Sequence, residues 1–179
     1  FADAEPVPDD GVPTILFLGR HEERKGLDVL LDALGSLPRD VRLWIAGEGP
    51  DTAALQHRTS GDPRVEWLGR ISDDEKASRL RGATLYCAPS LRGESFGVVL
   101  LEAMAAGTAI VASDLPGYRK VARAGRDAVL TPPGDAGLLA RALTGMLADA
   151  DRRAALVASG RERAQEFSMD RLASLYLDL

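Results

Sequence analysis

The stretch ATLYCAPSLRGESFGVVLLEAMAAGTAIVA, residues 83–112, decides the fold class of this chain. Its first six and last four residues are mostly apolar, as in strands that are buried on both faces. Between these runs, residues 96–106 have the apolar content and spacing of a buried helix. A strand, a helix and a second strand in this order predict a β-α-β unit with parallel strands.

The same alternation continues on both sides of this stretch. Strands are predicted over residues 14–18, 41–46, 65–68, 83–88, 109–112 and 128–131. Helices are predicted over residues 27–37, 51–59, 72–81, 96–106, 118–124, 136–148 and 151–166, and from residue 169 onward. This pattern predicts an α/β fold with a doubly wound parallel sheet of about six strands flanked by helices. With the common strand order 3-2-1-4-5-6, ligands bind between the first and fourth strands.

Composition fits one globular domain. Of the 179 residues, 45% are apolar and 27% are charged, and no apolar run is long enough to span a bilayer. Residues 1–13 hold three prolines and four acidic residues and are predicted to be a linker, so the domain is expected to cover 14–179. The net charge of −5 argues against a general nucleic-acid-binding surface.

The ends of the chain and its one cysteine add two expectations. Cys87 lies in an apolar run, which indicates a buried free thiol and fits a reducing, cytoplasmic location. No signal peptide is visible, and the chain begins at Phe1 without a methionine. We therefore expect it to be part of a longer protein.

Two loops border the expected crevice. The loop GRHEERKG (residues 19–26) supplies Arg20 and Lys25, and the loop PSLRGESFG (residues 89–97) leads into the helix expected to begin near residue 96. The free amides and the positive dipole end of a helix start bind anions, and Gly97 would let a phosphate approach the backbone closely. Arg and Lys would reach the same anion from the first loop. The two loops therefore predict a phosphate or diphosphate site.

Two carboxylates flank this helix start, although a core helix favours neither. Glu94 and Glu102 are eight residues apart, which is about 12 Å along a helix axis. Carboxylates would repel a phosphate but accept hydrogen bonds from hydroxyl groups. If Glu94 lies in the loop, the two acids could hold opposite ends of one ligand. The ligand implied is a sugar, a diphosphate and a ribose.

Each of these residues has a simpler interpretation when it is taken alone. Glu94 could be only a dipole partner of the helix, and Ser95 is expected to cap that helix. Glu102 could lie on a solvated helix face, and Arg20 and Lys25 could be surface charges. Because a parallel sheet would bring both loops into one crevice, the set together favours the binding site.

These residues carry a resemblance. The E-x7-E spacing of Glu94 and Glu102, the GR…KG loop and GEGP at residues 47–50 resemble the donor-binding C-terminal lobe of retaining GT-B glycosyltransferases, the glycogen-synthase-like and mannosyltransferase group. The resemblance runs from about residue 15 to the end and implies the Rossmann-like lobe of the GT-B fold. Within this group, the segments DDEKASRL, YCAPS and GESFGVVLLEAMAAGTAIVASD are most similar to the phosphatidylinositol mannosyltransferase subgroup, which uses GDP-mannose.

The resemblance implies a role for each matching residue. Glu94, Arg20 and Lys25 are the implied catalytic residues, with Glu94 on the donor sugar and the two cations on the leaving diphosphate. Glu102 would accept the ribose hydroxyls. An acid and a lysine in the implied base pocket would favour guanine. The implied donor-binding residues are Gly19, Arg20, Lys25, Ile71, Asp73, Lys76, Glu94, Ser95, Phe96, Gly97, Val98, Val99 and Glu102.

The implied function is transfer of a hexosyl group, mannosyl in the closest subgroup, from a nucleoside diphosphate sugar with retained configuration. The nucleotide sugar is a substrate, no tightly bound cofactor is expected, no metal cluster is visible, and a need for a divalent metal stays open. The expected partners are an N-terminal lobe of the same parent chain and an acceptor, in this subgroup a membrane lipid, but not a nucleic acid. The parent enzyme would be cytoplasmic and membrane-associated. This chain alone is expected to bind donor weakly without turnover.

Some features depart from the pattern or leave alternatives open. Many relatives carry Gly-Gly-x-x-Glu after the fifth strand, whereas DLPGYRK (residues 114–120) has no such Glu and leaves Tyr118 and Arg119 without a role. His21 is interpreted as a loop histidine and His57 as a solvated one. A dehydrogenase domain would require G-x-G-x-x-G in the first loop, which is absent. A UDP- or ADP-sugar donor and a non-catalytic nucleotide-binding module remain open.

Overall fold

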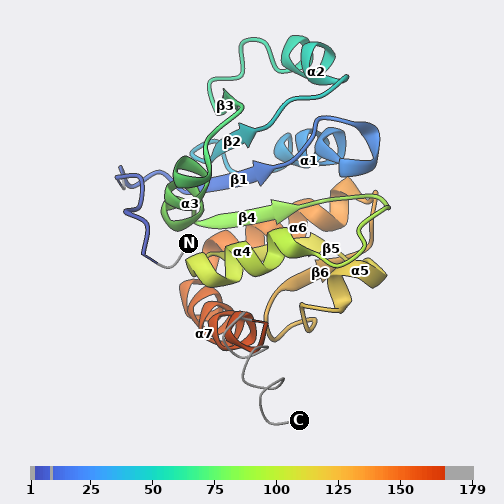
Figure 1. The fold of residues 1–179 in the computed structure, drawn as a ribbon. Helices are drawn as coiled ribbons and strands as arrows, with labels where there is room; N and C mark the ends of the chain where they lie inside the picture. The colour runs from blue at the N-terminus through green and yellow to red at the C-terminus, as the bar shows by residue number, and fades with distance from the viewer. Residues whose placement is uncertain (1–2, 9, 168–179) are drawn as a thin grey trace.

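The computed structural model describes residues 3–8 and 10–167. Within them, six strands form one parallel sheet in the order β3-β2-β1-β4-β5-β6 (Figure 1). The strands are β1 (Thr14–Leu18), β2 (Arg42–Ala46), β3 (Val65–Gly69), β4 (Leu85–Ala88), β5 (Ala109–Ser113) and β6 (Val129–Thr131). The predicted fold class and strand order are confirmed, and the order reverses between β1 and β4.

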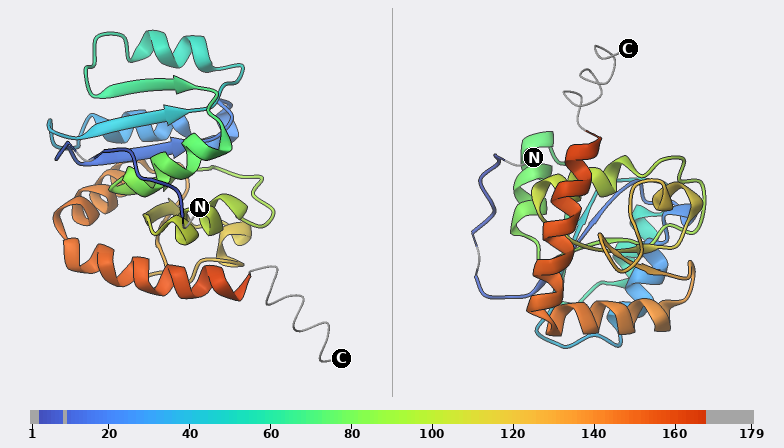
Figure 2. Two further views of the ribbon diagram at one scale, coloured as in Figure 1. Left: turned by 60° about the vertical axis from the view of Figure 1, so that its left-hand side comes forward. Right: turned by 90° about the horizontal axis from the view of Figure 1, so that it is seen from below.

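Helices cover both faces of the sheet, with α1 and α6 on one side and α3 and α4 on the other (Figures 1 and 2). Along the chain, the helices are the 3-10 helix η1 (Glu23–Lys25), α1 (Leu27–Leu34), α2 (Thr52–Arg58), α3 (Asp73–Gly82), α4 (Val98–Ala106), α5 (Pro116–Arg119), α6 (Ala136–Ala148) and α7 (Ala150–Glu166). The helix α7 packs against α4, where Gly160 lies close to the Met104 side chain. No helix in the described part of the chain is long and apolar enough to cross a membrane.

Alternate residues of the strands build two separate core layers. In β1, Ile15 and Phe17 pack with Leu143 of α6, while Leu16 packs on the other face with Leu100 of α4. All of these side chains are buried. Because both faces of the central strands need apolar side chains, β1, β4 and β5 are apolar along nearly their whole length instead of alternating with polar residues. Cys87 lies in the first layer, and its thiol is buried and unpaired, as expected.

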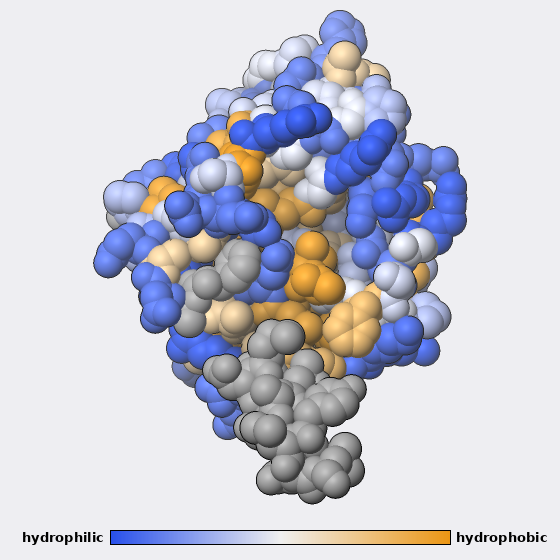
Figure 3. Space-filling model, viewed as in Figure 1, coloured by the Kyte–Doolittle hydropathy of each residue, from blue (hydrophilic) through white to orange (hydrophobic). Residues whose placement is uncertain are grey.

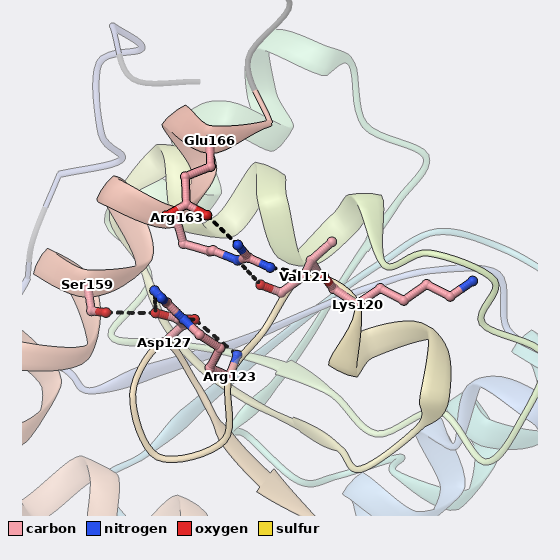
Figure 4. Close-up of polar contacts among 7 residues, drawn as sticks. All are labelled: Lys120, Val121, Arg123, Asp127, Ser159, Arg163 and Glu166. Carbon is pink, nitrogen blue, oxygen red and sulfur yellow. Dashed lines mark hydrogen bonds and ion pairs between the residues drawn. The ribbon is translucent and has the colours of Figure 1, made fainter. Parts of the chain in front are cut away.

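The predicted helix over residues 118–124 is wrong. The helix here is the four-residue α5, which begins at Pro116, and the chain then leaves the helical path. The reason is the carboxylate of Asp127, which accepts hydrogen bonds from the backbone amide and the guanidinium of Arg123 (Figure 4). From α7, Ser159 also donates to Asp127. These bonds hold residues 123–127 as a turn that is fastened to α7.

The two ends of the chain are described only in part. Residues 3–8 and 10–13 form no helix or strand, and the amide of Val7 donates to Ser78 O on α3. The assignment of residues 1–13 as a linker stays a prediction. The helix predicted from residue 169 onward lies outside the described residues.

Candidate active site

The loops after β1 and β4 are in direct backbone contact. The amide of Leu91 donates to Arg24 O at 2.8 Å. Gly26 adopts a left-handed φ of 66°, and a Cβ at this position would lie 2.1 Å from Pro89 O. Only glycine therefore allows the two loops to meet this closely. The predicted meeting of the two loops at the carboxyl ends of the central strands is confirmed.

The loop after β2 packs closely against the loop after β1. A Cβ at Gly47 would lie 1.9 Å from Gly19 O, and one at Gly49 would lie 2.2 Å from His21 O. His21 is also hydrogen-bonded to this loop through the backbone: its amide donates to Glu48 O at 3.2 Å. The two glycines of GEGP are thus required by close packing against the GRH segment.

His21 is buried where the loops after β1 and β2 pack together. Its side chain is fully buried, its Nδ1 lies 2.9 Å from Thr52 Oγ1, and its ring meets the edge of Trp67. Burial lowers the pKa of His21 below its ordinary value, although the nearby Glu48 and Asp51 carboxylates act in the opposite direction. The sequence placed His21 correctly in a loop but gave no sign of its burial. The only available signal was the glycine pair of GEGP.

Glu94 lies in the loop before α4, and two side chains contact its carboxylate directly. Lys25 Nζ lies 2.5 Å from Glu94 Oε1, and the Ser90 hydroxyl donates to the same oxygen at 2.9 Å. Ser90 Oγ in turn lies 3.1 Å from the hydroxyl of Tyr118 on α5. The Lys25 and Glu94 side chains are 20% and 11% exposed, so water screens this ion pair only in part.

The start of α4 differs from the prediction. Gly97 is the N-cap with a left-handed φ of 87°, so the helix begins at Val98 and not at residue 96. The expected cap by Ser95 is also wrong, because no side chain caps this helix and the Ser95 carbonyl instead accepts a hydrogen bond from Lys120 Nζ at 3.1 Å. An uncapped N-terminus leaves the first amides of α4 available to an anion. This property of the predicted site is therefore retained.

Side chains beside this helix start are exposed and apolar. Phe96 and Val98 are among the large apolar residues that remain exposed. In Figure 3, apolar side chains gather near the middle of the face that Figure 1 presents, where α4 lies. These exposed apolar side chains lie next to the candidate site.

Glu102, the second acid of the E-x7-E element, forms an ion pair with Lys76. Lys76 Nζ lies 2.9 Å from Glu102 Oε1 and 3.1 Å from Asp73 Oδ1. Burial acts to lower the pKa of Lys76, but the bonds to these two carboxylates outweigh it and raise the pKa above its ordinary value. The ammonium is therefore charged at neutral pH. The Lys76 ammonium thus links Glu102, which is predicted to bind the ribose, to Asp73, which is predicted to bind the base.

Two cavities meet at Lys76. One, of about 380 Å³, is lined by Asp73, Lys76 and Glu102, among others. The other, of about 360 Å³, is lined by Lys76, Ile71 and Arg20, among others, and reaches Gly19. The structure thus brings the predicted base and ribose residues next to the first loop.

Arg20 and Lys25 occupy different parts of the site. The Arg20 side chain is 66% exposed, lies 3.5 Å from a carboxylate oxygen of Glu22 and borders the cavity that contains Ile71. Lys25 contacts Glu94 instead. Among residues 3–8 and 10–167, no group of three or more His, Cys, Asp or Glu side chains is placed to hold a metal ion.

The model of a protein family described as glycosyl transferases group 1 matches residues 12–149. The chain belongs to this family. It is 45% identical over 166 residues to the phosphatidyl-myo-inositol mannosyltransferase of Mycobacterium leprae and 46% identical over 175 residues to that of Mycolicibacterium smegmatis. These matches cover 90% and 93% of this chain but only 44% and 45% of the two relatives. The glycosyltransferase domain thus spans less than half the length of these curated relatives.

Solved structures of glycosyltransferases share the fold. Sucrose-phosphate synthase from Thermosynechococcus elongatus matches with a TM-score of 0.85 and 28% identity, over 98% of this chain and 49% of that one. A crystallised C-terminal domain of a glycosyl transferase group 1 family protein from Francisella tularensis matches with a TM-score of 0.79 and 20% identity. That match covers 91% of this chain and 94% of the other. The chain therefore has the Rossmann-like fold of a GT-B glycosyltransferase lobe.

Proposed function

We propose that this glycosyltransferase domain binds GDP-mannose and serves a retaining transfer of its mannosyl group to a phosphatidylinositol lipid. The observation that supports it most is the pairing of each acid of the E-x7-E element with a lysine from another segment. Glu94 pairs with Lys25 and Glu102 pairs with Lys76, on the two sides of the α4 start. The names of the mannosyltransferase relatives support the choice of donor and acceptor.

The diphosphate of the donor would lie between the first loop and the start of α4. Lys25 and Arg20 would supply positive charge there, and the uncapped amides of Val98 and Val99 would donate hydrogen bonds. Negative charge grows on the diphosphate as the glycosidic bond breaks. Fixed donors in a partly buried site stabilise that charge more than water does, which lowers the barrier.

The other parts of the donor would use the two acids and the cavities beside Lys76. The sugar hydroxyls would donate to Glu94, and the ribose hydroxyls would donate to Glu102. The guanine N–H groups would face Asp73, with Lys76 near the guanine carbonyl and Ile71 against the ring. Because Lys76 contacts both Asp73 and Glu102, the base and ribose contacts would be made side by side.

The proposal assigns the acceptor to a second lobe of a longer parent enzyme. The exposed Phe96 and Val98 beside the site fit a surface that such a lobe would cover. The parent enzyme would act in the cytoplasm at the membrane that carries its lipid. No tightly bound cofactor is proposed, and positive charge on Arg20 and Lys25 would replace a divalent ion at the diphosphate. Donor binding should then be unchanged by EDTA.

Thermal shifts with GDP, UDP, ADP and NAD test the donor assignment. A ligand at a hundred times its dissociation constant stabilises a protein by roughly 2.7 kcal/mol. For a chain of this size, that should raise the unfolding midpoint by about 5–10 °C. We expect a shift with GDP that Glu102→Ala removes and that Glu162→Ala, at an exposed position of α7, retains.

Other outcomes would correct the proposal in defined ways. A preference for UDP or ADP would overturn the mannosyl assignment and leave a glycosyltransferase domain with another donor. A shift with NAD alone would contradict nucleotide-sugar binding. No shift with any of the four would contradict donor binding by this chain. In all cases, turnover of GDP-mannose by the chain alone would contradict the need for a second lobe.

A further inference from the structure

The helix α5 contacts the turn formed by residues 94–97, here called the Glu94 turn. A Cβ at Gly117 would lie 1.8 Å from Glu94 O, so the backbone of α5 touches the backbone of the turn. The ring of Tyr118 lies 3.0 Å from the position that a Cβ at Gly97 would occupy. Lys120, just after α5, donates from Nζ to Ser95 O. Three residues of one short segment therefore support both ends of the turn.

Tyr118 also reaches the Glu94 carboxylate through one intermediate side chain. The Tyr118 hydroxyl lies 3.1 Å from Ser90 Oγ, and Ser90 Oγ lies 2.9 Å from Glu94 Oε1. The Tyr118 and Ser90 residues are only 1% and 3% exposed. Water therefore has little access to this row of three polar groups, and each depends on its neighbour for hydrogen bonds.

The direction of the hydrogen bonds follows from the number of protons. A hydroxyl has one proton to donate, and a carboxylate has none. Ser90 donates its proton to Glu94, so the bond between Tyr118 and Ser90 requires the tyrosine as donor. Burial and the nearby Glu94 carboxylate raise the pKa of Tyr118 well above its ordinary value, so this donor keeps its proton at neutral pH.

Packing alone does not account for the tyrosine. A phenylalanine would fill the same volume in the core and would bring no buried hydroxyl that requires a partner. Instead, the Tyr118 hydroxyl is linked by hydrogen bonds, through Ser90, to Glu94. Glu94 is the acid that the proposed function assigns to the donor sugar. Glu94 Oε1 thus receives Lys25 from the phosphate side and Ser90 from the α5 side.

We propose that Tyr118 is a positioning residue that, through Ser90, holds the Glu94 carboxylate in the orientation that binds the hydroxyls of the donor sugar. The inference rests on the proposed function, because it requires a sugar at Glu94. Its effect should be confined to the sugar. The Tyr118 hydroxyl should matter for a nucleotide sugar and not for the nucleoside diphosphate alone, since the base, ribose and phosphates contact other residues.

Calorimetric titration of the chain with GDP and with GDP-mannose measures this difference. We expect Tyr118→Phe to weaken GDP-mannose binding about fivefold while GDP binding stays within about twofold, as for the loss of one hydrogen bond. Ser90→Ala should weaken GDP-mannose binding by about tenfold or more, because it removes the bond to the charged oxygen itself. In the Ser90→Ala background, Tyr118→Phe should have a clearly smaller effect than in the wild type, because the connection through Ser90 is already broken.

Tyr86→Phe is the matched control, since Tyr86 is equally buried in the same core layer but outside this row of bonds. It should leave the ratio of the two affinities unchanged. If the wild-type chain prefers another nucleotide, the same comparison is made with that nucleotide and its sugar. Equal losses for both ligands in Tyr118→Phe, or independent effects of the two substitutions, would overturn the positioning role. A wild-type chain that binds no nucleotide would instead overturn the proposed function.

Discussion

Lys25 Nζ lies 2.5 Å from Glu94 Oε1, although 69 positions separate the two residues in the sequence. The pair joins the loop after β1 to the loop after β4 at the point where the strand order reverses. A diphosphate beside Lys25 would compete with Glu94 for the same ammonium group. Lys25 is therefore placed to contact both the proposed diphosphate and the acid proposed for the sugar.

The charge of Lys25 should determine affinity for the diphosphate. We predict that Lys25→Met weakens GDP binding by about 10- to 100-fold, as expected for a charge-assisted hydrogen bond, and leaves guanosine binding unchanged. Arg141→Met is the control, because it removes a cation from the exposed surface of α6, and the cavity that Arg141 borders contains none of the residues proposed to contact the donor. Titration calorimetry with GDP and with guanosine measures the ratio of the two affinities. A ratio that Lys25→Met does not alter would place the diphosphate elsewhere.

The close contact at Gly47 should make this position intolerant of any side chain. Gly47→Ala introduces a Cβ 1.9 Å from Gly19 O at a φ of 119°, so the backbone must move. We predict a loss of at least about 2 kcal/mol of unfolding free energy. Gly145→Ala is the matched control in α6, where a Cβ meets nothing within 4 Å. This substitution should increase the free energy of unfolding by about 0.5–1 kcal/mol. Urea unfolding of both variants decides, and equal stabilities would mean that the loop contact is loose.

His21 should make stability depend on pH just below neutrality. Its pKa in the folded chain is lower than the ordinary value of 6.5, so the unfolded chain binds the extra proton first. The stability that neutral His21 provides is therefore present above about pH 6.5 and is lost as pH falls toward the lower folded pKa. The slope cannot exceed about 1.4 kcal/mol per pH unit for one group.

Urea unfolding between pH 8 and about 5.5 measures this slope, in a range above most carboxylate titrations. The His21→Gln variant should lose the slope, even if it is less stable at every pH. His57→Gln should keep the slope, because His57 is exposed on α2. A slope that survives His21→Gln would assign the pH dependence to other groups.

Asp127 should contribute more to stability than an ordinary acidic residue. Burial acts to raise the pKa of Asp127, but the hydrogen bonds from Arg123 and Ser159 outweigh it and lower the pKa, so the carboxylate is charged at neutral pH. We predict that Asp127→Ala costs about 2–3 kcal/mol, because partners of a buried carboxylate lose their acceptor. Ser159→Ala should cost about 1 kcal/mol. Equal unfolding midpoints for Asp127→Ala and the wild type would contradict this role.

The sheet could be predicted because its signals are local. Each strand is a short apolar run, and the rules for parallel connections then give the order of the six strands and the two loops beside the crevice. The same rules place the loops that carry Lys25 and Glu94 at one crevice, although they do not predict the ion pair between the two side chains. The pair of Lys76 and Glu102 was not predicted; it forms because α3 and α4 lie on the same face of the sheet.

The features that were predicted wrongly or missed depend on contacts between distant segments. The α4 start is at Val98 because Gly97 packs against Tyr118 and takes a left-handed φ, which the apolar spacing of residues 96–106 does not reveal. The burial of His21 depends on close approach by the GEGP loop. Likewise, Tyr118 had no role in the sequence because its hydroxyl meets Ser90 from 28 positions away.

The attachment of α7 sets the minimal length of a useful fragment. The guanidinium of Arg163 donates to the carbonyls of Val121 and Lys120, and Lys120 reaches the Ser95 carbonyl (Figure 4 shows the first two contacts). A fragment ending with α6 would contain the whole sheet and every predicted donor-binding residue, yet it would lack these anchors. Expression boundaries should therefore be placed beyond Arg163, since a complete sheet is not a complete support for the Glu94 turn.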